Sequence, residues 1–166
     1  MEIGKDNNPK PPRYQEVRET YALVVDACNI VRKTFGAGFL EEVYHKSLYY
    51  ELLRRGVKVD YKPRILLHYL DHEVGHYEPD LVVNDWLIIE LKACSGLTVE
   101  HSQQLVNYLN GTGREYGFLI NFGTPLIQTL PKTRKYGNIW ALMEFKQLRR
   151  FNSDNDLSFD DQDDKM

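Results

Sequence analysis

Two short apolar runs joined by Asn84-Asp85 constrain the fold of this chain more than any other segment. The runs cover residues 81–83 and 86–89, and each is long enough for a β-strand. An adjacent Asn and Asp favour a tight turn, so the segment predicts a β-hairpin. Charged residues stand at both outer ends, with Pro79-Asp80 before the hairpin and Glu90-Leu91-Lys92 after it. The hairpin is therefore expected to bring acidic groups from two strands to one end of a sheet.

The length of the hairpin loop decides whether these acidic groups meet. Side chains alternate along a strand, so Glu90 and Lys92 share a face. A two-residue turn would pair Asp80 with Ile89 and put its carboxylate on the opposite face. A three-residue loop over residues 84–86, or a bulge in the first strand, would pair Asp80 with Glu90. A joint role for the two carboxylates requires the longer loop or the bulge.

Two carboxylates held side by side repel each other, and a purely structural hairpin would avoid this pair. A divalent cation between them removes the repulsion, and carboxylate oxygens suit Mg²⁺ or Mn²⁺. With the Lys92 ammonium nearby, these groups could hold a metal ion and activate a water molecule. That combination indicates phosphodiester hydrolysis.

The composition is that of a globular chain with one domain. Its 166 residues are 42% hydrophobic and 27% charged, which allows a core without disulfides or a structural metal. No apolar run approaches the roughly 20 residues of a membrane span, and the N-terminus lacks a signal-peptide core, so we expect a cytoplasmic protein. Cys28 and Cys94 lie outside any metal-binding or redox spacing and are expected to be reduced and buried. A Cys94 nucleophile beside Lys92 remains an alternative.

Charge is unevenly distributed along the chain. The net charge is −3, but residues 154–166 contain six Asp and one Lys, which leaves +2 for residues 1–153. The folded body is therefore mildly basic and compatible with a nucleic-acid partner. We expect residues 1–13 to form a flexible leader, residues 14–150 a single domain, and residues 151–166 a disordered acidic tail.

Apolar periodicity predicts helices and strands in a mixed order. The expected helices cover residues 14–35, 40–55 and 99–110. The expected strands cover residues 57–61, 64–70, 74–83, 86–93 and 116–122, with a last strand near residues 139–144. This order indicates an α/β fold in which a mixed central sheet, an antiparallel meander plus a later strand, is flanked by helices. A parallel Rossmann sheet is disfavoured because the strands are consecutive and no G-x-G-x-x-G occurs.

Four motifs in chain order resemble those of one enzyme family. Pro79-Asp80 with Glu90-Leu91-Lys92 resembles the signature of the PD-(D/E)XK nuclease superfamily, which has the restriction-endonuclease-like fold. Residues 38–44 fit the pattern G-x-x-E-x-x-Y, and residues 104–108 fit the Gln-x-x-x-Tyr element of the lambda-exonuclease-like branch. Over about residues 20–142 the chain therefore resembles the GxxExxY protein family. The resemblance implies a magnesium-dependent nuclease that acts on DNA and leaves a 5′ phosphate.

The resemblance and the needs of phosphodiester hydrolysis together assign roles to the motif residues. A Mg²⁺ or Mn²⁺ ion would be held by Asp80, Glu90 and the backbone carbonyl of Leu91. Glu41 would extend the metal shell through water, and Lys92 would orient or deprotonate the attacking water. The candidate catalytic residues are Asp80, Glu90, Lys92, Glu41, Gln104 and Tyr108.

Helical spacing supports these roles independently of the family. Glu41 and Tyr44 are three residues apart, and Gln104 and Tyr108 are four apart, so each pair lines one helical face. Gln104 would orient Lys92 or a phosphate, and Tyr108 would support it. The simpler interpretations are a Glu41 that favours the helix dipole and tyrosines whose hydroxyls reach water. A purely structural role is harder to assign to Gln104, because a buried amide needs partners.

Other interpretations remain open at this point. The same fold could serve a catalytically inactive protein that binds nucleic acid or acts as a scaffold, and a homodimer would let two copies span a duplex. A carboxylate-pair glycosidase would have no need of Lys92. His68, His72 and His76 cluster around one turn and could bind zinc. Candidate contacts to a nucleic-acid backbone are Arg114, Lys132, Arg134 and Lys135.

Overall fold

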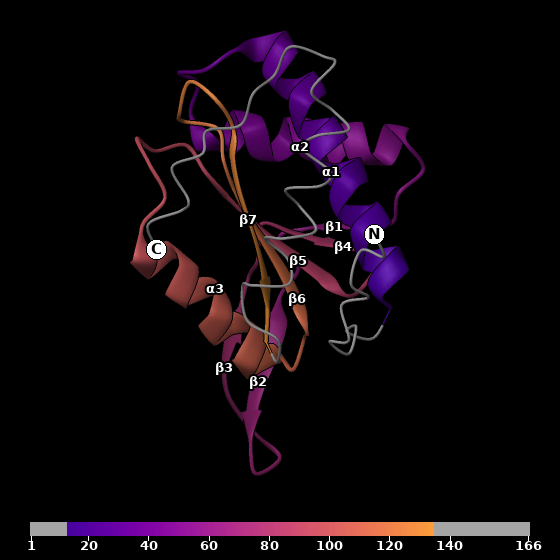
Figure 1. The fold of residues 1–166 in the computed structure, drawn as a ribbon. Helices are drawn as coiled ribbons and strands as arrows, with labels where there is room; N and C mark the ends of the chain where they lie inside the picture. The colour runs from indigo at the N-terminus through magenta and orange to yellow at the C-terminus, as the bar shows by residue number, and fades with distance from the viewer. Residues whose placement is uncertain (1–12, 135–166) are drawn as a thin grey trace, which may run out of the picture.

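The computed structural model describes residues 13–134, which form three helices and two sheets (Figure 1). The helices are α1 (Tyr14–Phe35), α2 (Glu41–Arg54) and α3 (Val99–Thr112). The strands are β1 (Val59–Tyr61), β2 (Ile65–Tyr69), β3 (His72–Tyr77), β4 (Leu81–Val83), β5 (Leu87–Lys92), β6 (Tyr116–Asn121) and β7 (Gln128–Thr133). None of the helices in this part of the chain is long and apolar enough to cross a membrane.

The main sheet has the strand order β1-β4-β5-β6-β7, and all of its neighbours are antiparallel except β5 and β6. The parallel pair is connected by α3, as parallel strands require a crossover. Helices α1 and α2 pack on one face, and α3 packs on the other. The α/β class with a mixed sheet flanked by helices is therefore confirmed.

Strand β5 lies at the centre of this sheet, and its side chains divide between the two faces. Leu87, Ile89 and Leu91 belong to the core under α1 and α2, whereas Ile88 belongs to the core under α3. Both faces of the central strands are buried, which explains why their sequences are nearly continuous in apolar residues. The alternation expected for β5 is confirmed, and it places Glu90 on the face of Ile88.

The expected antiparallel meander is wrong in one respect. The segment 74–83 contains two strands, because the chain leaves β3 after Tyr77 and enters β4 at Leu81. Strands β2 and β3 form a separate hairpin that extends past the main sheet beside α3 (Figure 1). Strand β1 pairs with β4 and not with the next strand along the chain, β2. Pro79 lies between the strands and has no amide hydrogen to donate to a sheet ladder, which accounts for the interruption.

Strand β7 was not expected from the sequence. It pairs antiparallel with β6, and Pro131 faces Phe118 in the register. Proline argues against a central strand, but within the described residues β7 is an edge strand, where proline is tolerated. The last strand predicted near residues 139–144, the acidic tail at 151–166 and nearly all of the predicted leader lie outside the described residues.

The ends of β5 and β6 are held together by buried side-chain hydrogen bonds. Asn121, opposite Lys92 in the register, is fully buried. Its Oδ1 accepts from the backbone N of Cys94 and of Gly123, each at 3.0 Å, and its Nδ2 donates to the Cys94 carbonyl at 3.0 Å. A Cβ at Gly123 would lie 2.3 Å from both the N and the O of Cys94. The chain that follows Lys92 is thus fixed by close backbone packing.

Replacing this glycine should destabilise the fold. Gly123→Ala forces Cβ against backbone atoms that cannot move aside, and we expect the free energy of unfolding to fall by roughly 3 kcal/mol in urea denaturation. Gly96→Ala is the matched control, because a Cβ there meets nothing within 4 Å. Equal stability of the two variants would contradict the packing described for this junction.

Candidate metal and active site

The β4–β5 hairpin has the three-residue loop that the carboxylate pair requires. Leu81 pairs with Ile89, and residues 84–86 form the loop, so Asp80 falls beside Glu90. The first two loop residues have positive φ angles of 51° and 66°. Asn and Asp tolerate this conformation better than other non-glycine residues, which explains their use at the tip. The predicted loop is confirmed, and no bulge is needed.

Backbone groups hold Asp80 on two sides. Its Oδ2 accepts from the backbone N of Leu91 at 2.7 Å, and its carbonyl accepts from the backbone N of Lys62 at 3.0 Å. The side chain is only 14% exposed. Burial raises the pKa of this carboxyl above its ordinary value, and the negative charge of Glu41 raises it further. Asp80 is therefore a fixed and poorly solvated acid.

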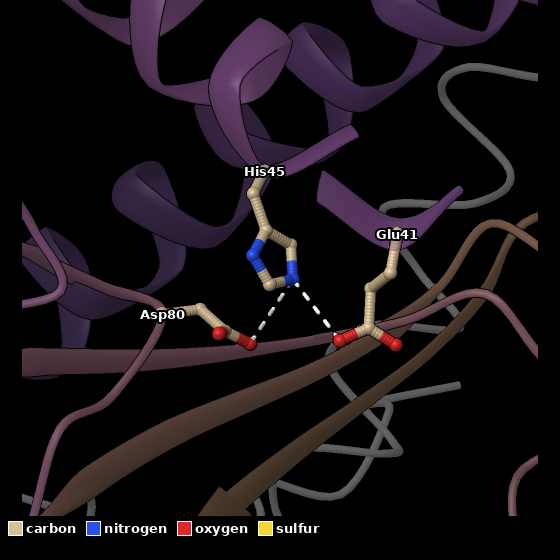
Figure 2. Close-up of side chains that lie close together, drawn as sticks. All are labelled: Glu41, His45 and Asp80. Atoms are coloured by element: carbon tan, nitrogen blue, oxygen red, sulfur yellow. Dashed lines mark ion pairs between the residues drawn. The ribbon is translucent and has the colours of Figure 1, made fainter. Parts of the chain in front are cut away.

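Helix α2 brings two further metal-binding groups to Asp80. Glu41 is the first residue of the helix, and His45 lies one turn later on the same face. His45 Nε2 is 3.3 Å from Glu41 Oε1 and 3.5 Å from Asp80 Oδ2, and Figure 2 shows the ring nitrogen directed between the two carboxylates. One potential ligand atom from each residue lies within 4.8 Å of the others. Among the described residues this is the one such group.

His45 is buried without satisfied hydrogen bonds. Its side chain is 4% exposed, and neither ring nitrogen has a hydrogen-bond partner within residues 13–134. Buried polar atoms are rarely left without partners, so the exceptions call for an explanation. A metal ion bound at Nε2 would provide one, since imidazole and carboxylates together form a usual donor set for divalent metals.

Glu90 has a partner of its own. The Tyr77 hydroxyl donates a hydrogen bond to its carboxylate. Burial and the negative charge of Asp80 raise the pKa of Glu90 to about 8. The Tyr77 ring stacks on Tyr108 with centroids 3.5 Å apart, and Gln104 Nε2 donates to the Tyr108 hydroxyl at 2.7 Å. The Gln-x-x-x-Tyr pair on α3 therefore reaches the site indirectly, through Tyr77.

This arrangement corrects two expectations. Gln104 is exposed rather than buried, and its recorded hydrogen bond goes to Tyr108, not to Lys92. Tyr44 is fully buried and its hydroxyl does not reach water, because it donates to the Gly36 carbonyl at 2.8 Å and accepts from the Phe39 backbone N at 3.2 Å. Helical spacing predicts which residues share a face of the helix. It does not predict which face packs against the sheet.

Lys92 ends β5 on the face that carries Glu90. The side chain is half-buried, and within residues 13–134 its ammonium makes no hydrogen bond or ion pair. Its positive charge lowers the pKa of both Asp80 and Glu90, against the effect of burial. The backbone N of Leu91 donates to Asp80. A strand residue directs its N–H and C=O to the same neighbouring strand, so the Leu91 carbonyl also faces the side of Asp80.

Several other sequence candidates stand apart from this site. His68, His72 and His76 are exposed and belong to no group of potential metal ligands among the described residues. Cys94 is half-buried and donates to the Gly96 carbonyl at 3.2 Å. Lys132 is buried in β7, which argues against both its predicted contact with a nucleic-acid backbone and its interpretation as a solvated loop residue.

Sequence reasoning missed two residues of the site. His45 had a usable signal, because it lies four residues after Glu41 and therefore on the same helical face. Tyr77 had none, since its contact with Glu90 depends on β3 leaving the main sheet and packing beside α3.

The groups at this site fit a divalent cation. Glu41, His45 and Asp80 each bring a potential ligand atom within 4.8 Å of the others, and Glu90 adds a carboxylate near Asp80. Among the described residues, His45 Nε2 has no hydrogen-bond partner. The pKa values of Asp80 and Glu90 are raised, mainly because burial disfavours their charged forms and further because each has a carboxylate neighbour. Such a set can bind a metal ion and position a water molecule beside Lys92.

The fold and its carboxylate-lined hairpin place the protein among nucleases with a restriction-endonuclease-like fold. The chain belongs to the PD-(D/E)XK nuclease superfamily, whose family model matches residues 18–133. No curated protein matches the sequence of this chain.

Three solved structures are similar at low sequence identity. The crystal structure of SSO0001 is 17% identical, has a TM-score of 0.45 and is matched over 81% of this chain and 70% of that chain. An alkaline exonuclease from Laribacter hongkongensis is 13% identical, has a TM-score of 0.43 and is matched over 89% and 81% of the two chains. A structure of the same exonuclease with dAMP is 15% identical, has a TM-score of 0.44 and is matched over 87% and 80%.

The raised pKa of Glu90 predicts a specific loss of stability with pH. In metal-free protein the folded state binds this proton more tightly than the unfolded state, whose carboxyl has the ordinary value of 4.5. The stabilisation is complete below about pH 4.5 and is lost as pH rises through about 8. In urea denaturation with a chelator, we expect wild type to lose stability from pH 5 to 9 relative to Glu90→Gln.

Glu51→Gln is the control for this experiment. The hydrogen bond from Arg54 lowers the pKa of Glu51 to about 2, so this group stays ionised throughout that range. The difference in free energy of unfolding between Glu51→Gln and wild type should not change between pH 5 and 9. A Glu90→Gln difference that is equally constant would show that Glu90 keeps an ordinary pKa.

Proposed function

We propose that this protein is a metal-dependent nuclease that hydrolyses phosphodiester bonds in DNA by a mechanism with two carboxylates and a lysine. The observation that carries the proposal is the register of the β4–β5 hairpin: Leu81 pairs with Ile89, so the next positions outward set Asp80 beside Glu90. Strand alternation keeps Lys92 on the face of Glu90. Membership of the PD-(D/E)XK superfamily supports nuclease chemistry. We also assign the chain to the GxxExxY family, on the strength of residues 38–44.

The metal in this proposal is Mg²⁺ or Mn²⁺. Asp80, Glu41 and His45 would hold it, with Glu90 and the carbonyl of Leu91 on the open side. When bound, the ion would lower the pKa of a water molecule and neutralise charge on the phosphate. The imidazole of His45 favours Mn²⁺ over Mg²⁺, because Mg²⁺ prefers an all-oxygen shell.

Other side chains would orient the attacking water, accept its proton and hold the site in position. Lys92 would orient the attacking water, or accept its proton when the amine is neutral. The Glu90 carboxylate is oriented by the Tyr77 hydroxyl and would assist from the same strand. Tyr108 and Gln104 stabilise the position of Tyr77 and so act at a distance from the reacting atoms. Two copies of the protein would be needed to cut both strands of a duplex at one position, which is consistent with a homodimer.

Cleavage of labelled oligonucleotides tests this proposal. We expect single- or double-stranded DNA to be cut in Mn²⁺ or Mg²⁺, with RNA cut more slowly. Asp80→Asn keeps an acceptor for the Leu91 amide but removes the charge, and Lys92→Ala removes the ammonium. Each should lower the rate by about 10²-fold or more, because metal binding and proton transfer each contribute at that level.

Lys58→Ala is the matched control, since this exposed lysine pairs with Asp85 at the other end of the hairpin. Its rate should equal that of wild type. Cleavage that survives both site substitutions would exclude this site as the source of the activity. Binding of DNA without cleavage in any metal would instead favour a catalytically inactive binding or scaffold protein.

A further inference from the structure

Glu42 lies on the opposite side of the His45 ring from the proposed metal ligands. Its Oε2 is 3.6 Å from His45 Nδ1, while Nε2 faces Glu41 and Asp80. The separation is slightly longer than a hydrogen bond, and Nδ1 has no hydrogen-bond partner among the described residues. A small shift of either side chain would close that gap. Glu42 is thus the nearest carboxylate for a proton on Nδ1.

The Glu42 carboxylate is itself held in place. The Tyr61 hydroxyl donates to Oε1 at 2.6 Å, and Lys62 Nζ donates to Oε2 at 2.9 Å. A charged carboxylate with two such donors is fixed in direction and remains a strong acceptor. Its position relative to His45 is therefore set by β1 and the turn after it, and not by α2 alone.

The same turn also holds Asp80. The backbone N of Lys62 donates to the Asp80 carbonyl, while its side chain binds Glu42. Lys62 has a φ of +46°, which is uncommon for a residue other than glycine. Strained conformations of this kind concentrate at functional sites, where the surrounding structure enforces them. The turn at Lys62 therefore fixes two groups. It holds Asp80, a proposed ligand next to β4, and Glu42, the carboxylate behind the proposed ligand His45 on α2.

A neutral imidazole carries one proton, and its location decides whether His45 can bind metal. With the proton on Nε2, the ring would donate to Glu41 or Asp80 and have no lone pair for an ion between them. With the proton on Nδ1, the ring would donate to Glu42 and present the Nε2 lone pair to those carboxylates. Second carboxylates behind metal-binding histidines select the tautomer in this way.

We propose that Glu42, clamped by Tyr61 and Lys62, is a positioning residue that keeps the His45 proton on Nδ1 and leaves Nε2 free for a divalent cation. This inference rests on the proposed metal-dependent function. It assigns a role to the second glutamate of the Gly38–Tyr44 motif, which the motif pattern itself leaves unspecified. It also makes metal affinity depend on three residues that do not touch the metal.

Mn²⁺ titration of the full chain by calorimetry tests the proposal in a double-mutant cycle. Glu42→Ala should weaken Mn²⁺ binding by about 10- to 100-fold, and Glu42→Gln should recover part of the loss because its amide oxygen still accepts from Nδ1. In a His45→Gln background, Glu42→Ala should have almost no further effect, since its action passes through the ring. Glu51 is an ion-paired glutamate farther along α2, so the Glu51→Ala variant should bind Mn²⁺ as wild type does.

Nitrogen NMR of ¹⁵N-histidine-labelled, Mg²⁺-loaded protein gives a second readout. Wild type should show a protonated Nδ1 on His45, and Glu42→Ala should lose that signature while the circular dichroism stays unchanged. An undiminished Glu42→Ala effect in the His45→Gln background would overturn the proposal, because Glu42 would then act directly or through the fold. Wild-type affinity in Glu42→Ala would overturn it as well.

Cleavage measured on the same samples separates this inference from the proposed function. Wild-type protein that cleaves DNA while Glu42→Ala binds Mn²⁺ normally would refute the role of Glu42 alone. Mn²⁺ binding that depends on Glu42 through His45, without cleavage of any substrate, would refute the nuclease function alone. Absence of Mn²⁺ binding to wild type would overturn both.

Discussion

The repulsion between two carboxylates held side by side in a poorly solvated place is the constraint on which the rest of the site depends. Asp80 and Glu90 are brought together by the three-residue loop of the β4–β5 hairpin, and burial together with the charge of Asp80 raises the pKa of Glu90. Folding tolerates this because the central sheet is buried on both faces by apolar side chains. Sites of this kind commonly exchange stability for function.

The surrounding elements act to keep these acids in position. Helix α2 contributes Glu41 and His45 from its first turns, and the buried Tyr44 clamps the loop in front of that helix through Gly36 and Phe39. The tyrosine of the G-x-x-E-x-x-Y pattern is therefore structural, while the glutamate faces the site. On the other face, α3 supports Glu90 through stacked tyrosines. Each motif found in the sequence lies on a different element around the site: α2, the β4–β5 hairpin or α3.

The local parts of this structure could be predicted from the sequence, and the non-local parts could not. Residues 14–35 form the expected helix, and the loop at residues 84–86 is one of the two arrangements that pairing Asp80 with Glu90 was expected to require. The separation of β2–β3 from the main sheet depends on which strand pairs with β1, and apolar periodicity carries no information about partners. Tyr77 was missed for that reason. His45 was missed although its spacing from Glu41 was available.

We propose that Glu41, His45, Asp80 and Glu90 surround one divalent cation. Crystals of the protein grown with Mn²⁺ and measured for anomalous scattering test it most directly. We expect an anomalous peak within coordination distance of His45 Nε2 and the carboxylates of Glu41 and Asp80, with Glu90 or the Leu91 carbonyl on the open side. Ordered side chains with no peak among them at saturating Mn²⁺, or a peak held by other residues, would contradict it.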